Sequence, residues 1–456
     1  PHMRRTQSRE SMSQRLSRVR EAAKQRKKER FTALFHLLTA EALENAFLSL
    51  SRKAAAGVDG VRWKDYAENL KVNIADLHRR LHQGSYRAQP GRRHYIPKAD
   101  GKQRPLGIAS LEDKIVQYAL VKILNAVYEN DFMGFSYGFR PGRSQHNALD
   151  ALATGLVRTN VNWVLDADIS QFFDKVSHEW LIRFIEHRIG DRRVIRLIRK
   201  WLTAGTSEEG EWRASEEGTP QGAVISPLLA NIYLHYVFDL WAHQWRRRHA
   251  TGNVVMVRYA DDIVIGFDKR IDAQCFRIAM QRRLKEFGLT VHPKKTRLME
   301  FGRFAAENRA SRGKGKPETF NFLGFTHISG KDRSGRFMLI RKTRRDRMTA
   351  TLKAIKDGLR KRWHYSIPEQ GKWLRRVVQG YLNYHSVPGN YPMMRKFRIY
   401  VTDLWRRALR RRSQQDDTTW TKANRLAAVW LPKVRVLHPW PVERFTARHP
   451  RQEPGA

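Results

Sequence analysis

Apolar residues recur every three or four positions in several long stretches of the chain, which is the spacing of helices with one buried face. The pattern predicts helices over about 31–50, 111–130, 177–204 and 271–287, and again over 393–409. Shorter runs of another kind separate these stretches. We therefore expect a fold that mixes helices with strands rather than an all-helical one.

Two short runs in the first quarter of the chain predict a β-hairpin. Residues 93–98 and 104–108 are the expected strands, and Asp100-Gly101 stands between them. Asp-Gly is a strong hairpin signal because glycine readily takes the positive φ that the tight turn requires.

Acidic residues stand at the ends of the strands predicted in the middle of the chain. The apolar run 163–168 ends in Asp168, and the runs 254–258 and 263–267 are separated by Tyr259-Ala260-Asp261-Asp262. Adjacent carboxylates are costly to bury unless a cation neutralises them. Such a set suits two Mg²⁺ ions that drive phosphoryl displacement. A solvated turn is the alternative, because Asp is common in turns.

The charge of the chain points to its partner. Among 456 residues, Lys and Arg number 87 and Asp and Glu 44, which gives a net charge of +43 and a pI of about 10.9. This balance predicts binding to nucleic acid. The one cysteine, Cys275, excludes an intramolecular disulfide and zinc sites built from several cysteines. No apolar run is long enough to predict a membrane span.

Several sequence blocks follow one another in a characteristic order. They are Tyr95-Ile96-Pro97-Lys98 with Arg104-Pro105-Leu106, Ser136 to Ser144, Asp168 to Asp174, Gly218 to Gly222 with Ser226 to Asn231, Tyr259 to Asp262, Gly288-Leu289 with Lys294-Lys295-Thr296, and Phe322 to Phe325. In these blocks the chain resembles the reverse transcriptase domain of group II intron-encoded proteins, with their maturase or thumb region. The resemblance extends over about residues 35–412.

The resemblance implies a role for each matching residue. The catalytic and metal-binding residues would be Asp168, Asp261 and Asp262, with the Ile169 carbonyl as a further ligand of two Mg²⁺ ions that Mn²⁺ can replace. The implied dNTP contacts are Lys98, Arg104, Phe173 and Gln221. The implied template or primer contacts are Arg140, Arg143, Tyr259 and Gly222.

Phe173 would exclude ribonucleotides, because a flat ring there clashes with a ribose 2′-hydroxyl. Its neighbour Phe172 is expected in the core. Asp166 and Asp174 are acids near the triad to which we assign structural roles: Asp166 within the fold and Asp174 at a helix start.

The implied fold class is α+β and multidomain: a right-hand polymerase fold with mixed α/β fingers and palm and an all-helical thumb, or maturase, domain. The expected parts are a tag remnant with a basic arm (1–32), an N-terminal extension (33–92), fingers (93–160), palm (161–335), thumb (336–412) and a basic, proline-containing tail (413–456). The arm is expected to fold only on binding, and the tail to be extended.

The leading function is that of an RNA-directed DNA polymerase that copies RNA, and also DNA, templates from dNTPs, and that acts in intron mobility and splicing. Ala260 favours this over a free-standing relative that the host uses in DNA repair by strand annealing, end joining and gap filling. A splicing maturase that mainly binds RNA is the alternative of another class. Phe173 argues against an RNA polymerase.

The partners expected from the resemblance are an RNA template, a DNA or RNA primer, dNTPs and group II intron RNA, with a homodimer left open and no membrane. The absence of a signal-peptide pattern favours a bacterial cytoplasmic protein associated with the nucleoid or with RNA. No Cys-x-x-Cys pair follows residue 412, so no HNH-type endonuclease domain is expected.

Overall fold

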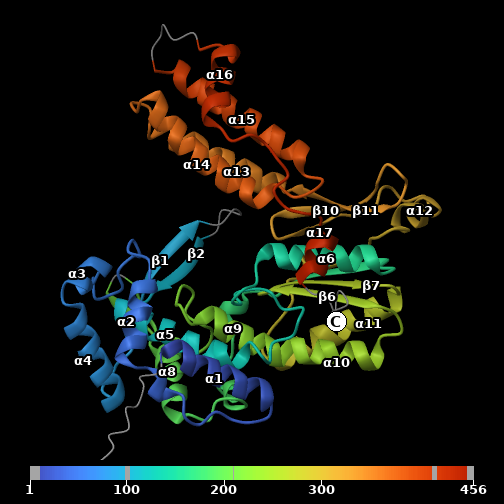
Figure 1. Ribbon diagram of the computed structural model, residues 1–456. Coiled ribbons are helices and arrows are strands. Elements are labelled where there is room, and N and C mark those ends of the chain that lie inside the picture. The colour runs from blue at the N-terminus through green and yellow to red at the C-terminus, as the bar shows by residue number, and fades with distance from the viewer. Residues whose placement is uncertain (1–10, 98–102, 209, 413–417, 449–456) are drawn as a thin grey trace, which may run out of the picture.

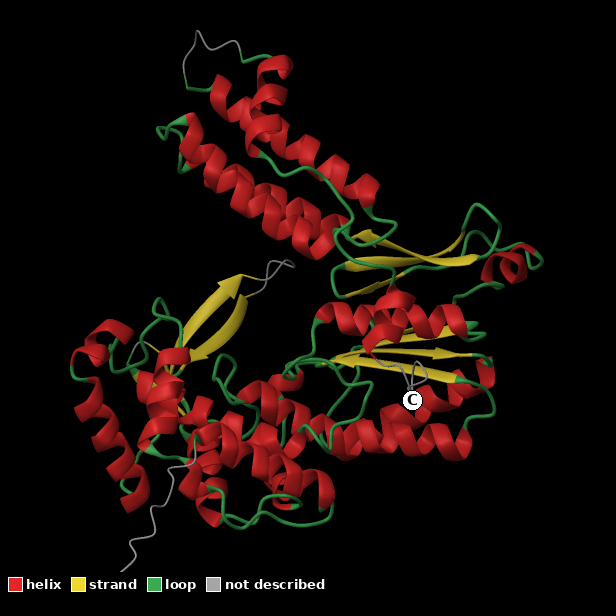
Figure 2. Cartoon of the chain, viewed as in Figure 1, coloured by secondary structure: helices red, strands yellow, loops and turns green. Residues whose placement is uncertain are grey.

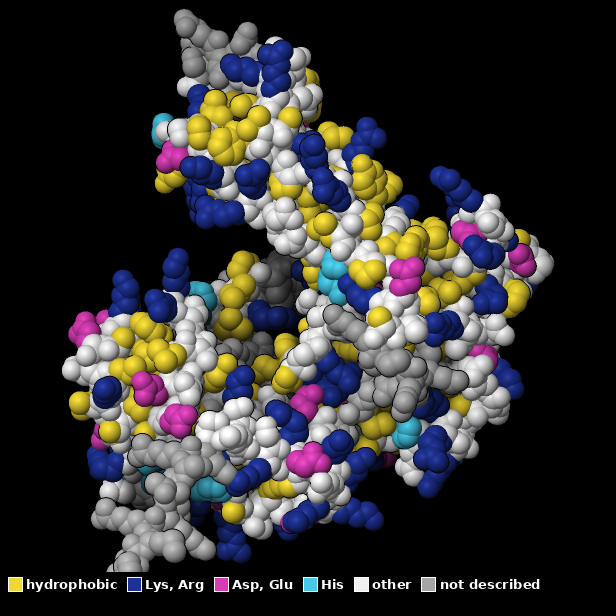
Figure 3. Space-filling view, viewed as in Figure 1, with side chains coloured by type: hydrophobic (Ala, Val, Ile, Leu, Met, Phe, Trp, Pro, Cys, Tyr) yellow, Lys and Arg dark blue, Asp and Glu magenta, His cyan; other side chains and the backbone are white. Residues whose placement is uncertain are grey.

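The structure has an N-terminal region, a central sheet and a C-terminal helical bundle. The computed structural model describes residues 11–97, 103–208, 210–412 and 418–448. In Figure 1 the N-terminal helices and the hairpin of β1 (Gly91–Pro97) and β2 (Gln103–Ile108) lie on one side. Strands β6 (Val254–Tyr259) and β7 (Asp262–Phe267) lie on the other, and the C-terminal bundle stands above both. The space-filling view has a hollow between the bundle and the hairpin, with Lys and Arg side chains around its rim (Figure 3).

The N-terminal region is helical. It contains α1 (Met12–Gln25), the 3₁₀ turn η1 (Phe35–Leu37), α2 (Ala40–Ser49), α3 (Trp63–Glu68) and α4 (Leu70–Gln83). Helices α1 and α2 pack against α5 (Leu111–Tyr128), most of whose side chains are buried. Helix α5 is therefore the central element of this core.

Helix α1 corrects the expectation that the basic arm folds only on binding. Ser11 caps its first turn, and partly buried side chains pack it on the core. Arg188, paired with Asp131, donates hydrogen bonds to backbone carbonyls of the same segment. The apolar positions that make the contact are Met12, Leu16 and Val19.

The predicted N-terminal hairpin is confirmed by β1 (Gly91–Pro97) and β2 (Gln103–Ile108), which pair in antiparallel fashion. Strand β4 (Thr206–Glu208) adds parallel to β1, and β5 (Glu211–Arg213) completes a sheet of order β2-β1-β4-β5. Most side chains of β1 are exposed.

The central sheet is antiparallel, with the order β6-β7-β3-β8. Its strands are β3 (Trp163–Asp168), β6 (Val254–Tyr259), β7 (Asp262–Phe267) and β8 (Arg297–Glu300). Helix α11 (Arg270–Glu286) packs on β3 and β7, whereas α6 (Gln145–Arg158) packs on β6. Because both faces are covered, the residues of β6 and β7 are buried except Tyr259 and Asp262 at the turn end, which explains their continuous apolar runs.

Further helices connect the hairpin sheet to the central sheet. They are η2 (Phe172–Asp174), α7 (His178–Glu186), α8 (Arg192–Thr203), α9 (Ser226–Leu234) and α10 (Leu240–His249). One π-helical turn, η3 (His235–Asp239), joins α9 to α10. Figure 2 shows the helices packed around the small sheets.

A three-stranded sheet leads to the C-terminal bundle. It contains β9 (Phe320–Phe322), β10 (Phe325–Lys331) and β11 (Phe337–Thr343), and α12 (Ala305–Ala310) precedes it. Leu323 and Gly324 form the turn between β9 and β10, both with positive φ. The Tyr384 hydroxyl donates a hydrogen bond of 2.8 Å to the Leu323 carbonyl. The bundle therefore contacts this turn directly.

The C-terminal bundle consists of α13 (Arg345–Arg360), α14 (Ile367–His385) and α15 (Tyr391–Arg410). Its core contains Tyr381 and Trp405, both buried, together with the apolar positions predicted for 393–409. Ser366 caps the start of α14.

The tail corrects the expectation of an extended segment. Helix α16 (Trp420–Trp430) packs on α14 and α15, and α17 (Pro441–Arg448) packs on α6. Arg444 of α17 forms an ion pair with the buried Asp150 of α6. Tertiary contacts of this kind stabilise short helices that the local sequence predicts only weakly.

No helix in the described ranges is long and apolar enough to cross a membrane.

Candidate active site

The acidic residues meet at one end of the central sheet. Asp168 ends β3, Asp262 begins β7, and the strand register places them opposite each other. Asp261 lies in the two-residue turn between β6 and β7. Strand β7 lies between β3 and β6, which places Asp262 beside both Asp168 and Tyr259, so the sheet itself brings the predicted carboxylates together.

The concentration of negative charge changes the protonation of these groups. Partial burial, and next the charges of Asp261, Asp168 and Asp166, raise the pKa of Asp262 to about 7, although its side chain reaches the surface. Burial, and then Asp168, raise the pKa of Asp261, while Arg104 and Lys295 oppose the rise. The site therefore favours a cation that offsets the charge.

Lys295 supplies part of that positive charge. Its Nζ atom lies 2.9 Å from Oδ2 of Asp168, and the Asp168 carbonyl accepts a 2.7 Å hydrogen bond from the His292 amide. In the described residues, no three His, Cys, Asp or Glu side chains converge as a preformed ligand set. The donors at the site are nonetheless all oxygens of incompletely neutralised carboxylates, which fits a hard cation such as Mg²⁺. Ile169, whose carbonyl was predicted as a further ligand, lies directly beyond Asp168.

Asp166 lies on the same face of β3 as Asp168, two residues earlier, and opposite Arg297 of β8. Burial raises the pKa of Asp166 to about 6, whereas Arg297 opposes the rise. Its charge contributes to the raised pKa of Asp262. Asp166 is thus part of the electrostatic environment of the site.

Two aromatic residues next to the acids differ in exposure, as predicted from the sequence. Phe172 is buried, whereas Phe173 is only partly buried. The ring of Phe173 meets the exposed Phe139 edge-on, with centroids 6.4 Å apart, and Phe139 also lies 6.3 Å from the ring of Tyr259. The motif around Phe139 predicts phosphate contacts by the neighbouring arginines, and the sequence gives no sign of these aromatic contacts.

The turn at Gly222 is joined to the N-terminal hairpin. The Gly107 amide of β2 donates a 2.6 Å hydrogen bond to the Gln221 carbonyl, and Gly222 has a φ of 106° that favours glycine. The Gln221 side chain donates a 2.6 Å hydrogen bond to Oδ1 of Asp174. Gly222 and Gln221 therefore lie at the base of the hairpin.

Of the two cations predicted on the hairpin, only Arg104 lies within the described residues. Arg104 is an exposed residue of β2 whose charge lowers the pKa of Asp261, so its field reaches the acidic site. Lys98 lies outside the described residues.

The arginines predicted to hold the template contact the protein. Arg140 is buried, pairs with Glu129 and donates hydrogen bonds to the carbonyls of Met133 and Ser136. Arg143 also donates to the Ser136 carbonyl. Both side chains support the loop before α6, and their template contacts stay predictions.

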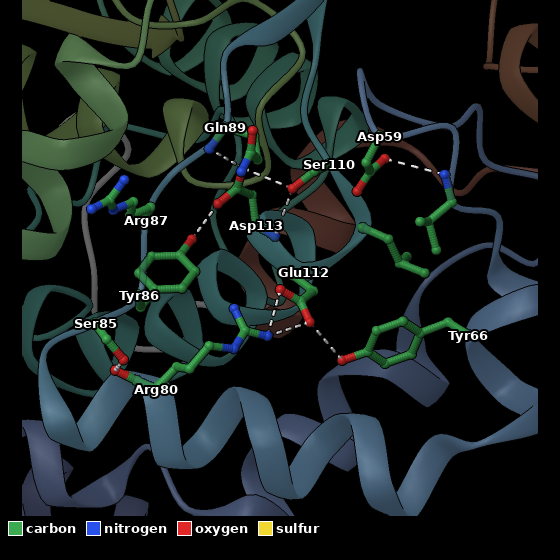
Figure 4. A pocket seen from close by; sticks show the side chains of 12 residues that line it. Asp59, Tyr66, Arg80, Ser85, Tyr86, Arg87, Gln89, Ser110, Glu112 and Asp113 are labelled. Atoms are coloured by element: carbon green, nitrogen blue, oxygen red, sulfur yellow. Dashed lines mark hydrogen bonds and ion pairs between the residues drawn. The ribbon is translucent and has the colours of Figure 1, made fainter.

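A separate cavity of about 460 Å³ lies at the base of the N-terminal region (Figure 4). Several of its polar groups have protein partners: Arg80 pairs with Glu112, and Asp113 accepts hydrogen bonds from Tyr86 and Ser110. None of the predicted site residues lines this cavity.

Comparison with known families bears on the acidic site. Residues 96–327 match the family model described as "Reverse transcriptase (RNA-dependent DNA polymerase)". The match begins at the end of β1 and spans β2, the central sheet and all three acids. The chain belongs to the reverse transcriptase family.

Among reverse transcriptases the chain is similar to group II intron proteins. It is 37% identical over 223 residues to group II intron-encoded protein LtrA of Lactococcus lactis subsp. cremoris, covering 48% of this chain and 37% of the relative. It is 43% identical over 206 residues to protein YkfC of Escherichia coli K12, covering 44% and 54%. It is 26% identical over 393 residues to the putative COX1/OXI3 intron 1 protein of Saccharomyces cerevisiae, covering 71% and 46%. The matches thus span about half or less of each relative.

Proposed function

We propose that this reverse transcriptase copies RNA templates into DNA from dNTPs and also accepts DNA templates. The observation that carries the proposal is the placement of Asp168 and Asp262 in register on adjacent strands, with Asp261 in the turn. In a chain of net charge +43, such an acidic centre serves catalysis better than nucleic-acid binding alone.

In this proposal the regions form a right hand. The β1–β2 hairpin belongs to the fingers, the central sheet is the palm, and α13–α15 form the thumb. The hollow in Figure 3 would hold the template–primer duplex, with the surrounding cations on its phosphates.

Each residue of the site has a defined task. Two Mg²⁺ ions bound by Asp168, Asp261 and Asp262 would activate the attacking 3′-hydroxyl and stabilise the leaving pyrophosphate. Arg104 attracts the triphosphate, and Lys98 is assigned the same role from its sequence motif. Gln221 and Gly222 support the nascent base pair from the base of the hairpin.

Phe173 and Tyr259 would shape the pocket for the sugar. Phe139 packs edge-on against Phe173 and would restrict the movement of its ring. A ring fixed in this way would exclude a ribose 2′-hydroxyl and select dNTPs. Phe139 also contacts Tyr259, so the same aromatic group would line both the nucleotide and the primer side.

The biological role that we propose is that of a group II intron protein in mobility and splicing, as a bacterial cytoplasmic protein bound to RNA or the nucleoid. The names of the relatives support it: LtrA is called group II intron-encoded, and a 29% identical Arabidopsis thaliana protein over 110 residues is called nuclear intron maturase 2. Host DNA repair by a free-standing relative is the competing role, and the relatives' names do not favour it.

The proposal is tested by primer extension on an RNA template with Mg²⁺, for the parent and for Asp261→Ala/Asp262→Ala. We expect DNA product from dNTPs with the parent, no product from rNTPs, and no product with the double variant, which should still bind RNA. No product from the parent, with tight RNA binding retained, would instead identify a maturase that only binds RNA.

A second series distinguishes the two polymerase roles. The parent is given a DNA template with short overlapping 3′ ends, alongside an RNA template of equal length. Much more efficient RNA copying supports intron mobility, whereas efficient annealing and filling of the DNA ends supports repair.

A further inference from the structure

Arg258, the residue before Tyr259, carries a charge buried directly beside the acidic turn. Both Arg258 and Asp239 have side chains with 0% exposure. Their bond is bidentate: Nε lies 2.7 Å from Oδ1 of Asp239, and Nη2 lies 2.6 Å from Oδ2. Replacing a buried ion pair by apolar residues is often neutral or stabilising. The pair therefore calls for a role other than stability.

The remaining N–H donors of Arg258 connect three other segments. Nη2 donates to the Ser136 hydroxyl at 2.7 Å, and Nη1 donates to Oδ1 of Asn231 at 3.2 Å and to the Ala260 carbonyl at 3.1 Å. All five donors of the guanidinium are thus used. Lysine has three donors on a single nitrogen and cannot reproduce this planar arrangement.

Ala260 is the residue that needs support. Its φ of 56° lies in the left-handed region, which a residue with a Cβ rarely adopts and which glycine usually occupies in such turns. Asp261 and Asp262 follow directly in the chain. Any relaxation of Ala260 therefore moves both carboxylates.

Gly138 holds the opposite side of the turn. A Cβ atom at Gly138 would lie 2.4 Å from the Ala260 nitrogen, so the two backbones are in close contact. The Asn231 side chain donates a 2.7 Å hydrogen bond to the Gly138 carbonyl and accepts one from Arg258. The turn is thus enclosed by one connected hydrogen-bond network.

We infer that Arg258 is the positioning residue of the acidic turn: its bond to the Ala260 carbonyl holds the strained turn so that Asp261 and Asp262 keep the geometry that catalysis needs. Arg258 has no contact with substrate and is not a catalytic residue. The inference rests on the proposed function for its kinetic part, and on the geometry of the turn alone for the rest.

The chain provides a matched control for a merely structural arginine. Arg188 has a side chain with 5% exposure, pairs with Asp131 at 2.7 Å and donates to backbone carbonyls. It supports the end of α1 and the segment after it, and no interaction in the described residues joins it to a predicted site residue. Arg188→Lys thus imposes a similar change in a buried network without touching the acidic turn.

The experiment compares Arg258→Lys with Arg188→Lys in four measurements: kcat and KM of primer extension, thermal stability, Mn²⁺ binding by electron paramagnetic resonance without nucleotide, and amide hydrogen exchange of residues 259–262. We expect Arg258→Lys to lower kcat about 10- to 100-fold, to weaken Mn²⁺ binding and to speed exchange in the turn. Arg188→Lys should lower thermal stability with little change in the other three.

Ala260→Gly then tests the mechanism by rescue. Glycine adopts the left-handed conformation without strain. Adding Ala260→Gly should therefore raise the kcat of Arg258→Lys about three- to tenfold. The same substitution should give no gain in the Arg188→Lys background. If Arg258→Lys does not fold, Ser136→Ala, which removes one acceptor of the guanidinium, should show a smaller loss with the same rescue.

Two results would overturn the inference. One is that Arg258→Lys and Arg188→Lys reduce kcat equally at equal stability; the other is that Ala260→Gly gives no rescue. A parent that extends no primer would instead contradict the proposed function, and Mn²⁺ binding and amide exchange would still decide the role of Arg258.

Discussion

Two β-hairpins of the same chain carry opposite charges and are supported in opposite ways. The β6–β7 hairpin bears the acids, and its strands are buried almost throughout. The β1–β2 hairpin bears Arg104, and most residues of β1 are exposed. The acidic hairpin is covered by packing on both faces, whereas the basic one is joined to its surroundings at its base through Gly107 and Gln221.

The difference follows from what each charge must do. Carboxylates that share metal ions repel one another and require a rigid framework, because a small displacement alters every distance between charges. A cation that attracts a triphosphate acts over several ångströms and tolerates movement. We therefore expect changes in the acidic hairpin to affect the rate of the reaction, and changes in the basic hairpin to affect nucleotide binding.

Among substitutions that keep all three acids, the largest effect on the rate is expected for Gly138→Ala. The new Cβ would lie 2.4 Å from the Ala260 nitrogen, so the acidic turn must move. Overpacking of this kind typically costs about 1–3 kcal/mol, which corresponds to a fall in kcat of up to about 100-fold. Single-turnover extension measures it. Gly315→Ala, where nothing lies within 4 Å, is the control and should be neutral.

Arg104→Ala is the matching change in the basic hairpin. Loss of a charged contact to phosphate should raise the KM for dNTP about 10-fold, with thermal stability unchanged because the residue is exposed. Steady-state kinetics measure the change. Arg213→Ala, in the edge strand β5 of the same sheet, tests for a general charge effect, and an equal KM increase there would argue against a specific contact.

Asp262→Asn tests what the acidic framework costs in stability. The pKa of Asp262 is raised to about 7 in the fold, above the value of 3.8 expected when unfolded. The parent therefore loses stability as the pH rises from about 4 to about 7, whereas asparagine does not titrate. Although activity is lost, the melting temperature should exceed the parent's by a few degrees at pH 8 and by less at pH 5. Solvent screening limits the gain, because the side chain reaches the surface.

The control for that experiment is Glu211→Gln on the exposed strand β5. It should change the melting temperature equally little at both pH values. A gain for Asp262→Asn that is the same at pH 5 and pH 8 would contradict the raised pKa.

The smallest effect is expected for Tyr384→Phe. The substitution removes the 2.8 Å hydrogen bond to the Leu323 carbonyl but keeps the ring stacked on Phe325. The hydrogen bond contributes about 1 kcal/mol to the contact between the bundle and the turn. Its loss should shorten extension products a fewfold without changing the KM for dNTP. Product-length analysis measures it. Tyr381→Phe, in the core of the same helix, should leave product length unchanged.

The acidic site could be predicted from the sequence because its signals are local. The apolar runs 254–258 and 263–267 predict the two strands on either side of Asp261. The run that ends in Asp168 predicts the third strand. The register that places Asp168 opposite Asp262 follows once these strands share a sheet. The positions of Phe172 and Phe173 in the motif likewise predict that Phe172 is buried and that Phe173 faces the site.

The support of the site could not be predicted, because it is built from residues far apart in the chain. In the sequence Arg258 is only the end of an apolar run, and its partners Ser136 and Asp239 lie 122 and 19 residues away. Helices α1 and α17 were missed for the same reason, since their partners lie on α5 and α6. Local patterns show which residues are buried but not which buried polar groups meet.

The contact between α17 and α6 also affects folding during synthesis. Arg444 and its partner Asp150 are 294 residues apart. At a synthesis rate of about 5–20 residues per second, α6 leaves the ribosome roughly 15–60 s before the helix that covers it. During that interval Asp150 has no Arg444 to neutralise it, and an apolar face of α6 is open to chaperones. Slow codons within this interval would lengthen the exposure and lower the yield of folded protein.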